Sequence, residues 1–241
     1  MPPFMLIPLA FLAGSIPFGF LIARAKGLDI RAHGSGNIGA TNVGRVLGKK
    51  FGILCFALDF IKGFAPTLAA GLVLGTAQSP TSAPLADVGL WLAAMSAAML
   101  GHVFTPWLGF KGGKGVATGF GAIMGVWPVL TLPAVAAFAT WYAVLKLSRY
   151  TSVASCAAAA ALPLWVALGG LIAVRPTTDT SAWPIWPYLA VASTLAAIAI
   201  FMHRTNIKRL RLGTEPKLGQ RAEPGSSATT IDAPCTSESR P

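Results

Sequence analysis

Glycines alternate with hydroxyl, amide and cationic side chains in residues 34–45, which read GSGNIGATNVGR. Glycine allows backbone N–H groups to approach an anion closely. Serine, threonine and asparagine add side-chain donors, and arginine can bind a phosphate through two parallel hydrogen bonds. The string therefore favours an oxyanion-binding loop, with a flexible loop tip as the plain alternative. The candidate ligands are Ser35, Gly36, Asn37, Thr41, Asn42 and Arg45.

A second string, HVFTPWLGFKGGKGVAT at residues 102–118, places two lysines among glycines just before an apolar segment. Free N–H groups and the helix dipole at a helix N-terminus attract anions. The spacing is not that of a Walker A loop, because glycine rather than serine or threonine follows Lys114. Lys114, Gly112 and Gly113 are therefore candidate ligands of a second anion. Lys111 is a further candidate, although a lysine here can also extend toward the membrane interface.

A third string, HRTNIKRLRLGTE at residues 203–215, follows the last apolar stretch. Arg204, Lys208 and Arg211 fit a basic helix on the cytosolic side of a membrane. His203 and Asn206 are three residues apart, so they would share one face of a helix. These two side chains are candidates for the same site as the two glycine strings.

Asp59 and Lys62 lie inside an apolar stretch, where a charge at the bilayer centre costs about 2.5–3.5 kcal/mol. Their i, i+3 spacing allows the two side chains to pair on a face that points toward other helices. A structural ion pair and a substrate-binding role for Lys62 are both open alternatives. The remaining carboxylates and the three cysteines show no ligand spacing, so the sequence predicts no metal site and no cofactor.

These strings must be positioned by apolar elements, because 54% of the 241 residues are hydrophobic and 11% are charged. A soluble domain carries about 25% charged residues. A helix that crosses a bilayer needs about 20 apolar residues, and the chain contains several stretches of that kind. They cover residues 2–23, 51–76, 85–102, 116–147, 153–174 and 184–202. The sequence therefore predicts an all-α integral membrane protein.

The net charge of +11 indicates an anionic partner. Basic residues sit between the apolar stretches and in the tail, as they do in cytosolic loops of membrane proteins. That placement excludes nucleic acid as the partner and favours an anionic small substrate or anionic lipid headgroups.

Charge placement also predicts the topology. The stretch 116–147 is too long for one crossing, and it can be one tilted helix or two helices in a hairpin around Pro128 and Pro133. Two crossings there place 17 of the 19 Lys and Arg residues on one side, leaving only Arg175 outside and Lys62 within a helix. The prediction is seven transmembrane helices with the N-terminus outside and the C-terminus cytosolic.

We expect one transmembrane catalytic domain over residues 1–216. Residues 217–241 are polar, rich in serine, threonine and proline, and are expected to be disordered.

The motifs together resemble one enzyme family. SGNIGATNVGR, DFIKG, GHVFTPWLGFKGGKGVAT and the tail pattern H-x-x-N-I-x-R-L-x-x-G-x-E are similar to those of bacterial acyl-phosphate:glycerol-3-phosphate acyltransferases, in the same order over residues 5–217. The resemblance implies a seven-helix enzyme of phospholipid synthesis in the bacterial inner membrane, with its site facing the cytosol. Its substrates would be glycerol 3-phosphate and acyl phosphate, and its products lysophosphatidic acid and phosphate.

The resemblance also implies roles for individual residues. Glycerol-phosphate contacts and catalysis fall to Ser35, Arg45, Lys114, His203 and Asn206. Substrate binding and shaping of the site fall to Gly36, Asn37, Thr41, Asn42, Lys62, Lys111, Gly112 and Gly113. Either His203 or a phosphate group of a substrate would act as the base, and the resemblance favours the phosphate.

Two other functions remain as alternatives. A transporter of a phosphorylated metabolite would also need basic residues, but it would show inverted repeats and a site near the midplane. A non-catalytic lipid-binding scaffold gives no reason for two loops of glycine with lysine or arginine. The sequence leaves acyl-chain preference and oligomeric state open.

Overall fold

The protein is described by a computed structural model that covers residues 2–80, 82–173 and 184–220. Every regular element in these ranges is helical. The α-helices are α1 (Leu6–Ser15), α2 (Phe18–Arg24), α3 (Ala40–Leu47), α4 (Lys49–Val73), α5 (Leu85–Val103), α6 (Val116–Met124), α7 (Thr131–Ser148), α8 (Thr151–Ala173), α9 (Trp186–Met202) and α10 (Arg204–Arg211). The tail beyond residue 220, which was expected to be disordered, lies outside these ranges. So does the loop with Arg175, which was expected to be external.

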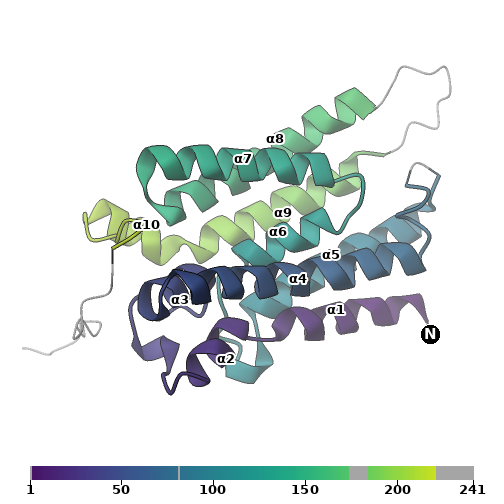
Figure 1. Ribbon diagram of the computed structural model, residues 1–241. Coiled ribbons are helices and arrows are strands. Elements are labelled where there is room, and N and C mark those ends of the chain that lie inside the picture. The colour runs from purple at the N-terminus through teal and green to yellow at the C-terminus, as the bar shows by residue number, and fades with distance from the viewer. Residues whose placement is uncertain (1, 81, 174–183, 221–241) are drawn as a thin grey trace, which may run out of the picture.

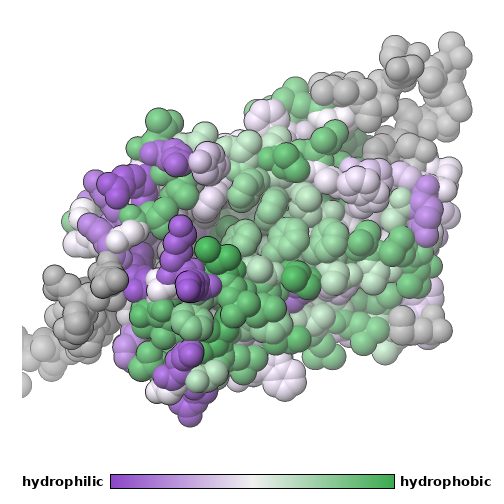
Figure 2. All heavy atoms as spheres, in the orientation of Figure 1, coloured by the Kyte–Doolittle hydropathy of each residue, from purple (hydrophilic) through white to green (hydrophobic). Residues whose placement is uncertain are grey.

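The long helices run side by side along one bundle, and the N-terminus lies at one end of it (Figure 1). The short helices α2, α3 and α10 lie together at the opposite end (Figure 1). Hydrophilic side chains gather at that same end, while a wide hydrophobic band covers the middle of the visible face (Figure 2). Such a band is what a bilayer requires of the surface that it touches.

Five helical segments are long and apolar enough to cross a membrane, and the bent pair of α9 and α10 would be a sixth. The prediction of an all-helical integral membrane protein is therefore confirmed at the level of five to six candidate spans. The stretch 116–147 is two helices, as the hairpin alternative requires. However, α6 has nine residues and is only about 14 Å long, which is less than the thickness of the hydrocarbon core.

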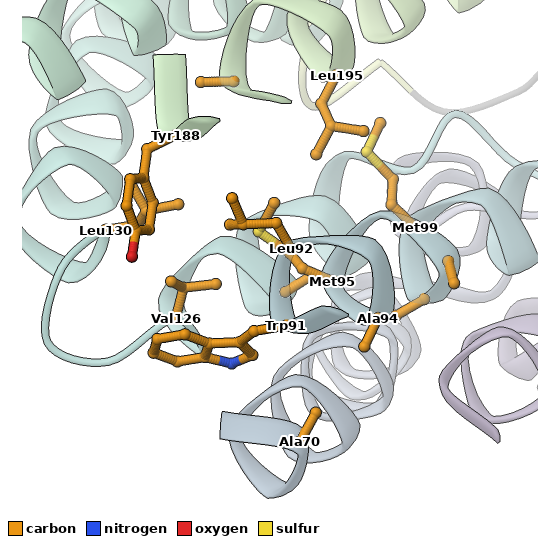
Figure 3. Close-up of a cluster of buried hydrophobic side chains, with 14 of the residues drawn as sticks. Ala70, Trp91, Leu92, Ala94, Met95, Met99, Val126, Leu130, Tyr188 and Leu195 are labelled. Atoms are coloured by element: carbon orange, nitrogen blue, oxygen red, sulfur yellow. The ribbon is translucent and has the colours of Figure 1, made fainter. Parts of the chain in front are cut away.

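Glycines let the helices approach each other closely. A β-carbon at Gly14 of α1 would overlap the carbonyl oxygen of Ala98 of α5, and one at Gly63 of α4 would overlap that of Thr118 of α6. Small residues at such contacts are how membrane helices gain packing without a hydrophobic driving force. Nearer the start of α5, Trp91 is fully buried and donates its indole N–H to the carbonyl of Thr67 at 2.9 Å. It lies in the apolar core shown in Figure 3.

The first apolar stretch is interrupted rather than continuous, because α1 ends at Ser15 and α2 begins only after Pro17. The break frees backbone carbonyls inside the bundle, where each needs a donor. Lys62 Nζ donates to the carbonyl of Ile16 at 2.6 Å, and Thr105 Oγ1 donates to that of Ser15 at 2.6 Å. Two later segments of the chain therefore stabilise this break.

Candidate active site

A cavity of about 210 Å³ opens at the hydrophilic end of the bundle. Its polar wall combines residues of the 34–45 loop, the segment before α6, the start of α8, the α9–α10 junction and the residues after α10. Asp59 of α4 and His102 of α5 also line it. The polar lining residues include Ser35, Asn37, Thr41, Arg45, Lys114, Ser152, His203, Asn206, Arg209 and Glu215. The three strings that the sequence singled out therefore meet in one place.

Lys114 is positioned by the start of α6. The next residue, Gly115, has φ 75° and is the N-cap of that helix, a left-handed conformation that favours glycine. Lys114 Nζ donates a hydrogen bond to Asn206 Oδ1. Burial, and secondarily the positive charge of Arg209, lowers the pKa of Lys114 to about 8. The amine therefore changes charge close to physiological pH unless an anion binds beside it.

A hydrogen-bond network extends from Asn206 to Glu215, which is 8% exposed. Glu215 Oε1 accepts from Asn206 Nδ2 at 2.6 Å and from Ser152 Oγ at 2.9 Å, and Arg209 Nε lies 2.8 Å from Oε2. Burial raises the pKa of Glu215, but these donors outweigh it and hold the pKa below its ordinary value. Glu215 is therefore a carboxylate that fastens α8 and α10 to the lysine-bearing segment.

His203 lies at the junction of α9 and α10, is 3% exposed and lines the cavity. Its Nδ1 lies 2.8 Å from the carbonyl oxygen of Ala199. A carbonyl only accepts hydrogen bonds, so Nδ1 must carry the proton in this pair. In the neutral ring Nε2 then has a free lone pair, which is the state that a proton acceptor needs.

Asn42 holds the 34–45 loop in shape. Its side chain accepts from the backbone N–H of Ser35 at 2.9 Å and donates to the carbonyls of His33 and Asn37 at 3.0 and 2.9 Å. Asn37 Oδ1 in turn accepts from the N–H of Gly39 at the start of α3. Arg45, in α3, reaches the cavity wall; burial lowers its pKa, but a guanidinium stays charged.

The other end of the cavity is apolar and lies between α6, α7, α8 and α9. Small side chains leave the space, and aromatic rings form part of the wall. The lining includes Phe120, Ala134, Ala137, Phe138, Trp141, Ala158, Ala159, Leu162, Leu195, Ala196 and Ala199. The cavity is therefore amphiphilic, with cations at one end and a hydrocarbon surface at the other.

Five predicted binding residues do not line this cavity. Lys111 is exposed, and Lys62 pairs with Asp59 at 2.8 Å inside the bundle, so the pairing expected from their spacing is confirmed. The N–H groups of Gly112 and Gly113 donate to the carbonyls of Val103 and His102. They are thus already used within the protein and are not available as donors to a substrate in this structure, contrary to expectation. Gly36 also lies outside the cavity lining, although its neighbours Ser35 and Asn37 belong to it.

Three residues of the hydrogen-bond network around Glu215 were not assigned a role from the sequence. Arg209 and Glu215 belong to the tail pattern H-x-x-N-I-x-R-L-x-x-G-x-E. The presence of one carboxylate, Glu215, among many cations was the signal that could have identified them. Ser152 gave none, because its contact with Glu215 depends on how α8 packs. Within the described ranges, no group of three or more His, Cys, Asp or Glu side chains could hold a metal ion.

Comparison with known proteins supplies the remaining observation. A family model described as glycerol-3-phosphate acyltransferase matches residues 4–213. The chain belongs to the glycerol-3-phosphate acyltransferase family. It is a membrane enzyme of that class, and the resemblance seen in the motifs is confirmed.

Several curated members of the glycerol-3-phosphate acyltransferase family are similar to the chain over nearly its whole length. The Geobacter sulfurreducens enzyme is 47% identical over 214 residues, which is 88% of this chain and 95% of that protein. The Aquifex aeolicus enzyme is 40% identical over 215 residues, which is 89% of this chain and 98% of that protein.

Two solved structures of PlsY (YgiH), an integral membrane glycerol 3-phosphate acyltransferase, share the fold. The glycerol 3-phosphate form has a TM-score of 0.76 at 38% identity and covers 91% of this chain and 96% of its own. The lysophosphatidic acid form has a TM-score of 0.74 at 37% identity and covers 91% of this chain and 97% of its own.

Proposed function

We propose that this acyltransferase takes its acyl group from acyl phosphate and transfers it to glycerol 3-phosphate, forming lysophosphatidic acid and releasing phosphate. The amphiphilic cavity carries the proposal. Both substrates bear phosphate, and Arg45 and Lys114 supply cations at the polar end. The apolar end between α6 and α9 belongs to the same cavity and offers a hydrophobic surface for the acyl chain.

The reaction needs little from the protein beyond placement and charge. A hydroxyl of glycerol 3-phosphate attacks the acyl carbonyl, the new ester C–O bond forms, and the bond between the acyl carbon and the phosphate oxygen breaks. Phosphate leaves with the electron pair of that bond, and the hydroxyl proton passes to a base. Arg45 and Lys114 stabilise the negative charge that gathers on the phosphates and the carbonyl oxygen, which is the largest contribution in many acyl transfers.

The base has two candidates. His203 lines the cavity, and its Nε2 has a free lone pair in the neutral tautomer that the Ala199 carbonyl selects. A phosphate oxygen of either substrate can take the proton instead, and we favour it because both substrates bring one to the site. Ser35, Thr41 and Asn206 would hold the phosphates or the hydroxyl, while Asn37 and Asn42 keep the loop in place.

One assay tests the proposal against its alternatives. Purified protein is incubated with labelled glycerol 3-phosphate and either palmitoyl phosphate or palmitoyl-CoA. We expect labelled lysophosphatidic acid with palmitoyl phosphate alone. Product with palmitoyl-CoA alone would overturn the donor assignment, and binding or flux without product would favour a transporter or a lipid-binding scaffold.

The site assignment makes its own prediction. Lys114→Ala and Arg45→Ala should each abolish transfer, because each removes a cation from the phosphate end, while both proteins still insert into the membrane. Leu132→Ala is a matched control, since this side chain is 77% exposed on α7 and should keep wild-type activity. Near-normal activity in either cation variant would contradict the assignment.

For the topology we propose seven crossings, an external N-terminus and a cytosolic C-terminus in the bacterial inner membrane. The N-terminus lies at one end of the bundle, and the basic helix α10 lies at the opposite end beside α3, which carries Arg45 (Figure 1). This arrangement supports the proposal. In this arrangement α6 would cross only part of the bilayer, and α4 and α7 beside it would cover the remaining depth. The site would face the cytosol, and residues 1–216 would form the catalytic domain.

A further inference from the structure

The glycine pair before Lys114 rests on the C-terminal end of α5. The N–H of Gly112 donates to the carbonyl of Val103 at 3.0 Å, and that of Gly113 donates to the carbonyl of His102 at 3.2 Å. A β-carbon at Gly112 would overlap the carbonyl oxygen of His102. The turn therefore lies directly against the helix end, with its donors facing the protein.

Gly113 lies against a side chain rather than against backbone. A β-carbon there would overlap Nε2 of His102 and lie 2.9 and 3.1 Å from Cε1 and Cδ2 of the same ring. Gly112 and Gly113 do not have positive φ angles, unlike Gly115. Alanine could adopt their backbone conformation, so the reason for glycine at position 113 is the closeness of the histidine ring.

The ring of His102 is held from its other side by charged residues of α4. It is 4% exposed, and Nδ1 lies 3.7 Å from Asp59 Oδ1. The same oxygen lies 2.8 Å from Lys62 Nζ, whose amine also donates to the Ile16 carbonyl at the break between α1 and α2. His102 therefore sits in a layer between the buried Asp59–Lys62 pair and the Gly112–Gly113 turn.

We propose that His102, supported by Asp59 and Lys62, is a positioning residue: its ring is the surface on which Gly113 rests, and this contact sets the position of Lys114 at the phosphate end of the cavity. The proposal rests on the proposed role of Lys114. That role is tested separately by Lys114→Ala. An active Lys114→Ala protein would disprove the role of Lys114, and the Gly113–His102 contact would still be tested by the paired substitutions below.

The test uses paired substitutions that differ in how far the side chain at position 102 reaches. Asparagine places its terminal atoms near Nδ1 and Cδ2 of histidine and has none near Nε2, whereas glutamine reaches the Nε2 position. Transfer rate and thermal unfolding are measured in detergent for Gly113→Ala alone and with His102→Asn or His102→Gln. Gly112→Ala with His102→Asn is the matched control, because the clash at Gly112 is with a backbone oxygen.

Gly113→Ala should lose about 100-fold in kcat/KM, the size of effect that a displacement of about 1 Å at a catalytic site produces. Adding His102→Asn should restore at least about tenfold of that loss, since the overlapping atom is gone. Adding His102→Gln to Gly113→Ala, or His102→Asn to Gly112→Ala, should restore nothing. The substitution at His102 should therefore restore activity only when it removes the atom that overlaps the new β-carbon at position 113.

Three results would overturn the proposal. They are near-wild-type activity in Gly113→Ala, equal recovery with His102→Gln and His102→Asn, and a folded Gly113→Ala/His102→Asn protein as inactive as Gly113→Ala. If His102→Asn prevents folding, His102→Ser is the second truncation, with the same outcomes. Gly89→Ala, on the same helix with open space around it, should be silent throughout.

Discussion

At Lys114, burial in the cavity wall lowers the pKa to about 8, so the free enzyme loses this cation as the pH rises through 8. A phosphate monoester has its second pKa near 6, and its charge is therefore constant over that range. We expect KM for glycerol 3-phosphate to rise between pH 7.5 and 9, because the anion then meets a neutral amine. Lys114→Arg, which keeps its charge, should flatten that rise if it remains active. A KM that stays constant in the wild type would contradict the assignment.

His203 can be separated from a substrate phosphate as the base by one substitution. A general base contributes about 10²–10⁴-fold to the rate. We expect His203→Gln to keep kcat within about fivefold of wild type at saturating glycerol 3-phosphate, since a substrate phosphate then still takes the proton. A loss of about 100-fold or more, in a protein with unchanged thermal unfolding, would identify His203 as the base instead.

At the scale of elements, the helices around the apolar end should set which acyl chains fit. Ala137 of α7 is 9% exposed and lines the cavity. Ala137→Phe should fill space there and lower kcat/KM for palmitoyl phosphate relative to decanoyl phosphate by at least about tenfold. Leu132→Phe is the control, because it adds volume at an exposed position of the same helix. An unchanged ratio in Ala137→Phe would place the acyl chain elsewhere.

The sequence predicted much of this arrangement because membrane helices follow hydropathy and because Asp59 and Lys62 are one turn apart. The three polar strings could be recognised, and their meeting at one end followed from the charge count. The direction of the N–H groups of Gly112 and Gly113 could not be predicted, because it depends on contact with the end of α5. The same holds for Ser152 and Glu215, which meet only when α8 packs beside the segment after α10.

Hydropathy also does not locate breaks inside an apolar stretch. Residues 116–147 form one predominantly apolar stretch, which is divided into a nine-residue α6 and an 18-residue α7 by a break that contains Pro128. A β-carbon at Gly121 would overlap the carbonyl oxygen of Phe60 in α4. A short helix can be held in this position by its neighbour without having the length of a full crossing.

At the scale of the whole molecule, the topology is a direct prediction. Fusions of a phosphatase active only outside the cell and a fluorescent protein active only inside should report a cytosolic C-terminus and an external N-terminus. The physical reason for this expected orientation is that cationic loops stay on the cytosolic side during insertion. Charge-neutral fusions at residue 80, expected outside, and at residue 149, expected inside, provide internal controls. An external C-terminus would contradict both the prediction of seven crossings and the prediction that the three strings share one cytosolic site.

The hydrogen bonds that close the polar end of the cavity join residues far apart in the chain. Lys114 meets Asn206 and Ser152 meets Glu215. Chains are made from the N-terminus. The first helices therefore enter the membrane before Asn206 and Glu215 have been translated. A chain that stopped before residue 206 would have most of the bundle but would lack Asn206, Arg209 and Glu215 at the cavity wall. We therefore expect activity only after residue 215 has been made, and translation products interrupted before it should be inactive.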